Sequence, residues 1–157
     1  MRKHILSAAP ESADQPGIDV RSLATVYVTS EDSAHPIDLA FDGHHGPGGT
    51  YWLAAQPGPQ KIIVAFDTPH TIQKVIVETE EREASRTQEM ALAISRDGGS
   101  TYRELRRQEF NFNPDSTTWE REEWILAEAD VTHVSLSIKP DKGRKDCRAS
   151  LTTFALS

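Results

Sequence analysis

The sequence predicts an all-β domain, a jelly-roll β-sandwich of two antiparallel sheets with about eight strands. Short β-branched or alternating segments recur along the chain and are separated by turn residues. The charged segment 78–89 contains good helix formers, but it lacks the apolar stripe of an amphipathic helix. With 157 residues, 37% of them hydrophobic, the chain has the size and composition of one globular domain with one core.

The expected strands are identified by their residue patterns. Residues 25–29 alternate and are β-branched, as in a half-buried strand. The continuous apolar run 61–66 is typical of a fully buried strand, and turn residues follow it at 67–69. The Asp-Gly-Gly at 97–99 indicates a hairpin. Further strands are expected at residues 71–78, 90–95, 102–105, 108–112, 118–125, 132–139 and 151–156.

The segments between these strands are expected to be irregular. Proline, glycine and small polar residues make 1–17 an irregular lead-in, which leaves 18–157 as the folded domain. Residues 36–40 have the composition of a short helical turn, and residues 80–87 that of a charged loop between strands. No second change of composition indicates a further domain.

Charge and cysteine content narrow the classes of partner and the expected location. The formal net charge is -7, which opposes a nucleic-acid backbone or an anionic membrane surface as the main partner. The N-terminal apolar stretch is too short for a secretory signal. Cys147 is the single cysteine, so no internal disulfide can form. We therefore expect a cytoplasmic protein.

One loop combines oxygen-bearing side chains, a tight turn and large aromatics. An apolar run enters Asp42-Gly43, a glycine-rich segment follows at 46–49, and the loop ends at Thr50-Tyr51-Trp52. Glycine allows such a backbone to turn sharply and its carbonyls to converge. The loop is thus a candidate ion site that ends in a candidate core aromatic.

The order and spacing of these motifs resemble the discoidin domain, also called the coagulation-factor C-type domain, of the galactose-binding-like superfamily. The resemblance extends over most of the chain from residue 18 onward and implies the sandwich fold. Its motifs lie at residues 24–31, 36–43, 50–52, 60–66, 72–77 and 93–99. The segment 31–36 is short and polar, unlike the apolar loops that lipid-binding members insert into membranes, so no membrane partner is expected.

The resemblance also implies a structural calcium ion at the loop. Its ligands would be Leu39, Asp42 and Thr50, with a carboxylate from Asp42, a hydroxyl from Thr50 and backbone carbonyls; calcium takes about 6–8 oxygens. Members of the family usually add a glutamate from the last strand, where this chain has Thr152 or Thr153. In the alternative, Asp42 and Thr50 satisfy the loop backbone without a metal.

The resemblance places a ligand at loops on one end of the sandwich, where aromatic rings stack on sugars and polar side chains bind hydroxyl groups. The candidate ligand-binding residues are Trp52, Arg82, Arg86, Asn111, Phe112 and Asn113. The alternatives stay open: Trp52 and Phe112 can be core residues, and the two arginines can pair with nearby glutamates. Basic residues also cluster near the C-terminus, at Lys139, Lys142, Arg144, Lys145 and Arg148.

The sequence contains no catalytic signature. It has no Gly-x-Ser-x-Gly, no phosphate-binding glycine loop and no His-Glu-x-x-His, so we do not expect an enzyme. The predicted function is a non-catalytic ligand-binding module, with carbohydrate as the ligand and the loops at one end as the site. The alternative is a cytoplasmic protein–protein interaction module or a subunit of a larger assembly.

Overall fold

The computed structural model describes residues 17–143 and 146–157. The expected lead-in 1–17 therefore falls, apart from Gly17, outside the described residues, as do Arg144 and Lys145 of the basic cluster. Within the described residues the elements follow in the order α1 (Val20–Leu23), β1 (Ala24–Val28), η2 (Ile37–Ala40), β2 (Trp52–Pro57), β3 (Gln60–Glu80), β4 (Arg86–Ser95), β5 (Arg103–Phe112), β6 (Trp119–Lys139), β7 (Arg148–Leu151) and β8 (Thr153–Leu156).

The all-β antiparallel sandwich predicted from the sequence is confirmed. The large sheet has the order β1-β3-β6-β4-β5, with β8 also paired to β3, and a small sheet pairs β2 with β7. All of these pairs are antiparallel. Both helices have four residues, and no helix in the described part of the chain is long and apolar enough to cross a membrane.

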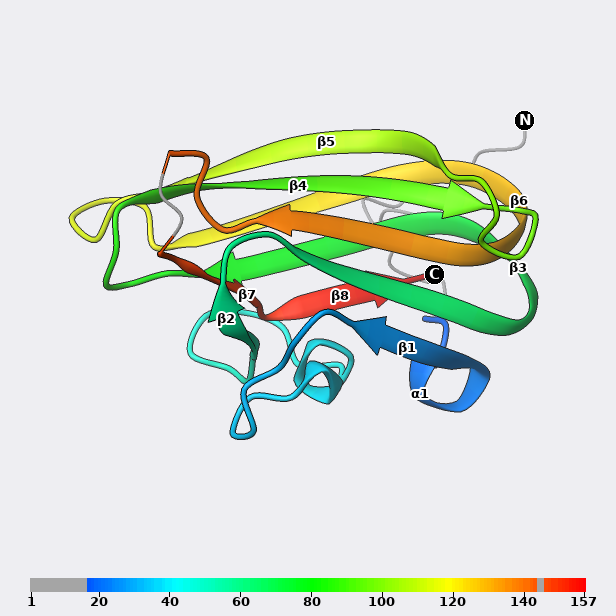
Figure 1. Cartoon of the computed structure of the whole chain (residues 1–157), viewed down its shortest axis with the longest axis horizontal. Coiled ribbons are helices and arrows are strands. Elements are labelled where there is room, and N and C mark those ends of the chain that lie inside the picture. Colours follow the sequence, from blue (N-terminus) through cyan, green and yellow to red (C-terminus); the bar gives the residue numbers. More distant parts are fainter. Residues whose placement is uncertain (1–16, 144–145) are drawn as a thin grey trace, which may run out of the picture.

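Two long strands connect the layers of the sandwich. β3 and β6 have 21 residues each, run to one end of the molecule, bend there and return (Figure 1). At the bend the register between them shifts several times between Ala65 and Lys74, and Asp130 of β6 has a positive φ of 57°. Such irregularities let a strand change direction. As a result, each of the two strands contributes one half to one layer and the other half to the second layer.

The bend corrects the expected strand boundaries. Segments 61–66 and 71–78 are one strand, β3, and 118–125 and 132–139 are one strand, β6. Residues 102–105 and 108–112 belong mostly to β5, while the expected last strand is divided between β7 and β8. β2 was not predicted, because its Ala-Ala-Gln-Pro sequence lacks β-branched residues.

The core lies between the layers and is filled by the inward faces of the strands. In β6, Val134, Leu136 and Ile138 are buried, as their alternation predicted. The largest fully buried apolar side chains are Trp52, Phe110, Phe154, Ile62, Ile72, Met90, Leu92, Leu136, Ile138 and Leu151. This core fixes the strand ends from which the loops project.

Candidate functional site

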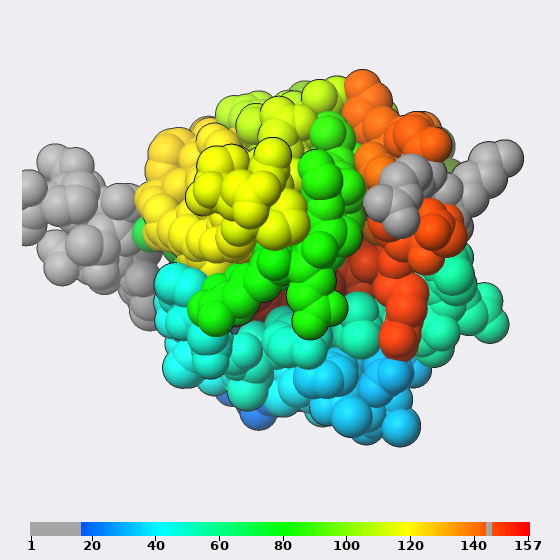
Figure 2. Space-filling model, turned by 90° about the vertical axis from the view of Figure 1, so that its left-hand side faces the viewer, coloured from blue at the N-terminus to red at the C-terminus, as the bar shows by residue number. Residues whose placement is uncertain are grey.

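The loops at the end opposite the strand bends form the candidate site. Figure 2 looks onto this end, with residues 81–85 in the middle (green), residues 113–118 on one side (yellow), and the chain around β7 on the other (orange-red). A hollow lies on either side of the 81–85 loop. The residues that were predicted to form one ligand site therefore do not all lie in one hollow.

The first hollow, here called the Tyr51 hollow, has a volume of about 500 Å³. Its walls come from the start of β2, the loop between β3 and β4, and the start of β7. The aromatic and charged side chains that line it include Tyr51, Glu80, Arg82, Glu83, Asp146 and Arg148. An aromatic ring, two guanidinium groups and several carboxylates therefore surround one space.

Tyr51 provides the aromatic surface of this hollow. Its side chain faces outward because it neighbours the buried Trp52, and successive residues of an extended chain point in opposite directions. The His35 ring stacks on it with centroids 4.2 Å apart and an interplanar angle of 17°. Tyr51 is still 37% exposed. The stack holds the tyrosine ring in one orientation and leaves part of it open to a ligand.

Arg82 reaches into the Tyr51 hollow from the loop between β3 and β4. Its guanidinium donates to a Glu80 carboxylate oxygen at 3.1 Å, and its side chain is 65% exposed. Glu80 also accepts hydrogen bonds from the Gly48 amide at 3.2 Å. An exposed ion pair contributes little to stability, so Arg82 can exchange its partner for a ligand at small cost.

Arg148 forms the more rigid wall of the same hollow. Its Nε donates to the Ala54 carbonyl at 2.7 Å and its Nη2 to the Asp32 carboxylate at 2.9 Å. Hydrogen bonds from the Ala34 amide and from Arg148 hold the pKa of Asp32 below its usual value. Arg148 is thus a fixed cation whose carboxylate partner stays ionised near neutral pH.

The second hollow, here called the Asn111 hollow, has a volume of about 450 Å³ and is mainly polar. Asn111 accepts a hydrogen bond from the Thr87 hydroxyl at 2.8 Å, and Asn113 accepts one from the Asp115 amide at 2.9 Å. Asn113 thereby stabilises the turn at 113–116. Both amides line this space, but Trp52 and Arg82 are not among its lining residues.

Residues 25–149 match the F5/8 type C domain. This chain belongs to that family. The match covers most of the chain and confirms the resemblance stated from the motifs. No curated protein sequence matches the chain.

Solved structures resembling this F5/8 type C domain include several carbohydrate-binding modules. The family 32 module of C. perfringens NanJ, in complex with galactose, is 14% identical with a TM-score of 0.65, covering 89% of this chain and 96% of that one. Module CBM32-3 from a family 31 glycoside hydrolase of Clostridium perfringens is 15% identical with a TM-score of 0.67, covering 94% of this chain and 98% of that one. The CBM32 of AlyQ, in complex with 4,5-unsaturated mannuronic acid, is 17% identical with a TM-score of 0.62, covering 91% and 98%. At these identities the likeness establishes a shared fold.

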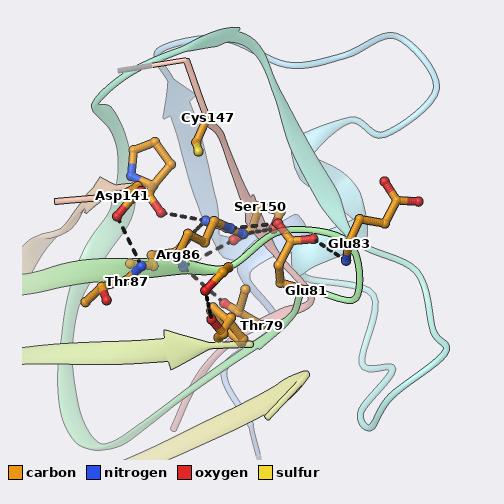
Figure 3. A network of polar contacts seen from close by, with 12 residues as sticks. Thr79, Glu81, Glu83, Arg86, Thr87, Asp141, Cys147 and Ser150 are labelled. Atoms are coloured by element: carbon orange, nitrogen blue, oxygen red, sulfur yellow. Dashed lines mark hydrogen bonds and ion pairs between the residues drawn. The ribbon is translucent and has the colours of Figure 1, made fainter. Parts of the chain in front are cut away.

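Arg86 borders the Asn111 hollow but is buried, which argues against its assignment as a ligand-binding residue. Its guanidinium donates to Glu81 at 2.7 Å and to the Gln88 side chain at 2.7 Å. It also donates to the Pro140 carbonyl at 2.8 Å and to the Ser150 hydroxyl at 3.1 Å (Figure 3). With 1% of its side chain exposed, Arg86 joins the loops instead of facing a ligand.

Trp52 and Phe112 are also buried, so neither provides a stacking surface. Trp52 is 0% exposed, and its Nε1 donates to the Ser30 carbonyl at 3.0 Å. The Phe112 ring lies 5.4 Å from the Arg86 guanidinium and packs edge-on against Phe110. Of the six candidates, Arg82, Asn111 and Asn113 remain exposed. The sequence analysis missed Tyr51, although the burial of its neighbour Trp52 implies that it faces outward.

The expected calcium loop is closed by hydrogen bonds between its own groups. Asp42 accepts hydrogen bonds from the His44 amide at 3.0 Å and from the Thr50 hydroxyl. Thr153, which occupies the region where the family carries a glutamate, donates to the His44 carbonyl at 2.8 Å. In the part of the chain that the structure describes, no group of three or more His, Cys, Asp or Glu side chains could hold a metal. Because Asp42 and Thr50 are hydrogen-bonded to each other, a calcium ion at Leu39, Asp42 and Thr50 would have to replace that contact.

The calcium binding that the resemblance implies at Leu39, Asp42 and Thr50 can be tested by a thermal titration. Because the loop oxygens are already hydrogen-bonded, we expect millimolar calcium to change the melting temperature by less than about 1 °C. Magnesium at the same concentration serves as the control for ionic strength. A rise of several degrees that is specific for calcium would mean that the loop rearranges around the ion.

Proposed function

We propose that this F5/8 type C domain is a non-catalytic carbohydrate-binding module whose site is the Tyr51 hollow. The observation that carries the proposal is the Tyr51 ring, which is braced by His35 and partly open beside Arg82. A rigid aromatic surface favours the apolar face of a sugar ring, and neighbouring arginine and carboxylate groups form hydrogen bonds with its hydroxyls. These groups support ligand binding and not catalysis.

The composition of the hollow favours a neutral sugar. Its carboxylates, Glu80, Glu83 and Asp146 among them, outnumber its two guanidinium groups. An acidic sugar would have to approach these carboxylates, and like charges at short distance are unfavourable. The galactose and uronate complexes of the structural relatives support carbohydrate as the ligand class. The cytoplasmic location expected from the sequence stays a prediction.

The Tyr51→Ala substitution tests this site. We expect it to weaken binding of a neutral sugar at least tenfold, since the stacking surface is lost, and to change the unfolding free energy by less than about 1 kcal/mol. A glycan array identifies the sugar, and isothermal titration calorimetry measures its affinity. The matched control is Tyr27→Ala on β1, which removes a tyrosine that is 59% exposed and lies outside the hollow.

Two outcomes would contradict the proposal. Equal sugar affinity in Tyr51→Ala and wild type would remove the Tyr51 hollow as the site. Silence across the array, together with a stoichiometric protein partner recovered from native lysate, would favour the alternative of a protein–protein interaction module.

A further inference from the structure

The outward face of the large sheet carries a third hollow, here called the Ala91 groove. Its volume is about 410 Å³, within the range of about 300–1,000 Å³ that is usual for small-molecule sites. The floor is formed by Ala91 and Ala93 of β4 and by Ser137 of β6. None of the residues that line it is aromatic.

The strand register explains why the sheet is hollow at this place. Ser137 pairs with Lys61 of β3 on one side and with Ala91 on the other, and Ala91 in turn pairs with Arg107 of β5. Residues that pair across a sheet point to the same face. The two middle strands thus present small side chains while the strands on either side present long ones, and a trough results.

Two lysines on one side of the groove have no partner. Lys61 and Lys139 both line it, and neither makes an ion pair or a side-chain hydrogen bond. Every other lysine or arginine within residues 17–143 and 146–157 makes at least one such contact. In a chain of net charge -7, two unpaired ammonium groups therefore gather at one hollow.

The carboxylate nearest to Lys139 along the sheet is held elsewhere. Glu89 pairs with Lys139 in the strand register, but its carboxylate binds Arg107 and lies 3.8 Å from the Lys142 ammonium. Arg107 also donates to Glu104 at 2.6 Å. On this side of the groove every carboxylate thus has a cation partner, with Glu89, Glu104 and Glu109 sharing Arg107 and Lys142, while the two lysine ammonium groups on the β3 side have none.

Serine hydroxyls beside the lysines are unpaired as well. Ser135 is only 5% exposed, and its position between Ile63 and Ala93 places it on the same outward face as the groove. Within the described residues, the hydroxyls of Ser135 and Ser137 have no hydrogen-bond partner. Ser137 lines the groove and pairs with Lys61 in the strand register, so its unused hydroxyl suits a ligand rich in oxygen acceptors.

We propose that the Ala91 groove binds a small organic dicarboxylate, with one carboxylate at Lys61, the other at Lys139, and its hydrocarbon part over Ala91 and Ala93. The two lysines are diagonal neighbours across β3 and β6, and such positions are about 7–8 Å apart. Flexible ammonium groups at this spacing suit two carboxylates joined by a short carbon chain. Phosphate sites usually use converging backbone amides, whereas the amides of these strands take part in the sheet ladder.

The test compares glutarate with its neutral analogue glutaramide. Backbone amide NMR shifts of the intact chain are followed at low salt while each compound is added. We expect saturable shifts at Ala91, Ala93 and Ser137 with glutarate and none with glutaramide. The double substitution Lys61→Gln and Lys139→Gln should weaken glutarate binding at least about tenfold.

Matched controls separate specific binding from bulk charge. Arg103→Gln removes one positive charge from a side chain that lies outside the groove and should leave glutarate affinity unchanged. Equal shifts with glutaramide, or unchanged glutarate affinity in the double variant, would overturn the proposal. So would displacement of glutarate by an equal concentration of sulfate, since the groove would then hold any anion. Sugar binding at the Tyr51 hollow should persist in the double variant, so the two proposals succeed or fail separately.

Discussion

Replacing Trp52 by alanine should lower the unfolding free energy by about 3–5 kcal/mol, the range found when a large buried aromatic is removed. The ring is fully buried, and Trp52 pairs with Leu151 across the small sheet. Its loss would leave a cavity where β2 meets the core and would leave the Ser30 carbonyl without its indole donor. Small domains are stable by about 5–15 kcal/mol, so this variant would be only marginally folded at room temperature.

Urea denaturation monitored by circular dichroism measures this loss of unfolding free energy without relying on tryptophan fluorescence. The Ile125→Ala control removes an apolar side chain that is 60% exposed, and it should change the unfolding free energy by less than about 0.5 kcal/mol. The Trp52→Phe variant should lose less than the alanine variant, because most of the packing is kept. A Trp52→Ala protein within about 1 kcal/mol of wild type would show that the ring is not a core residue.

The Arg86→Ala substitution should cost about 2–4 kcal/mol of unfolding free energy, somewhat less than the usual effect of breaking a fully buried ion pair. Glu81 would lose its cation but is partly exposed and can rehydrate, whereas the Pro140 carbonyl and Ser150 would lose a buried donor. Arg86→Lys should recover only part of the loss, because one ammonium cannot reach four acceptors in different directions.

Arg82→Ala is the matched control for Arg86, since it removes a neighbouring arginine of the same loop region that is 65% exposed. Its effect on stability should stay within about 0.5 kcal/mol, while its effect on sugar binding should be the larger one. If Arg86→Ala unfolded like wild type and lost only ligand affinity, Arg86 would belong to the ligand site after all.

The contrast between Arg82 and Arg86 shows what the sequence could not predict. Both arginines stand in one charged run, and local pattern gives them the same role. Their difference arises from partners that are remote in sequence: the Pro140 carbonyl is 54 residues from Arg86, and the Ser150 hydroxyl is 64 residues away. Only the fold brings these groups together.

Other features were predictable because they depend on local pattern. The alternation in residues 134–138 predicted which side chains are buried, and the Asp-Gly-Gly at 97–99 marked the turn between β4 and β5, where both glycines have positive φ. The bend in β3 was predicted as a break, since Asp67-Thr68-Pro69 reads as a turn. Its continuation as one strand depends on pairing with β6, which local sequence does not encode.

The bent strands also have a consequence for how the domain folds. Because β3 and β6 contribute to both layers, neither layer can form its full set of strand pairs until these two strands meet. Their register joins Gln60 to Ile138 and Glu80 to Trp119, so the contacts span much of the chain. Contacts of such long sequence separation are associated with slow folding. The two layers are thus expected to gain and lose structure as one cooperative unit, and the loops around the Tyr51 hollow should become ordered only when both layers form.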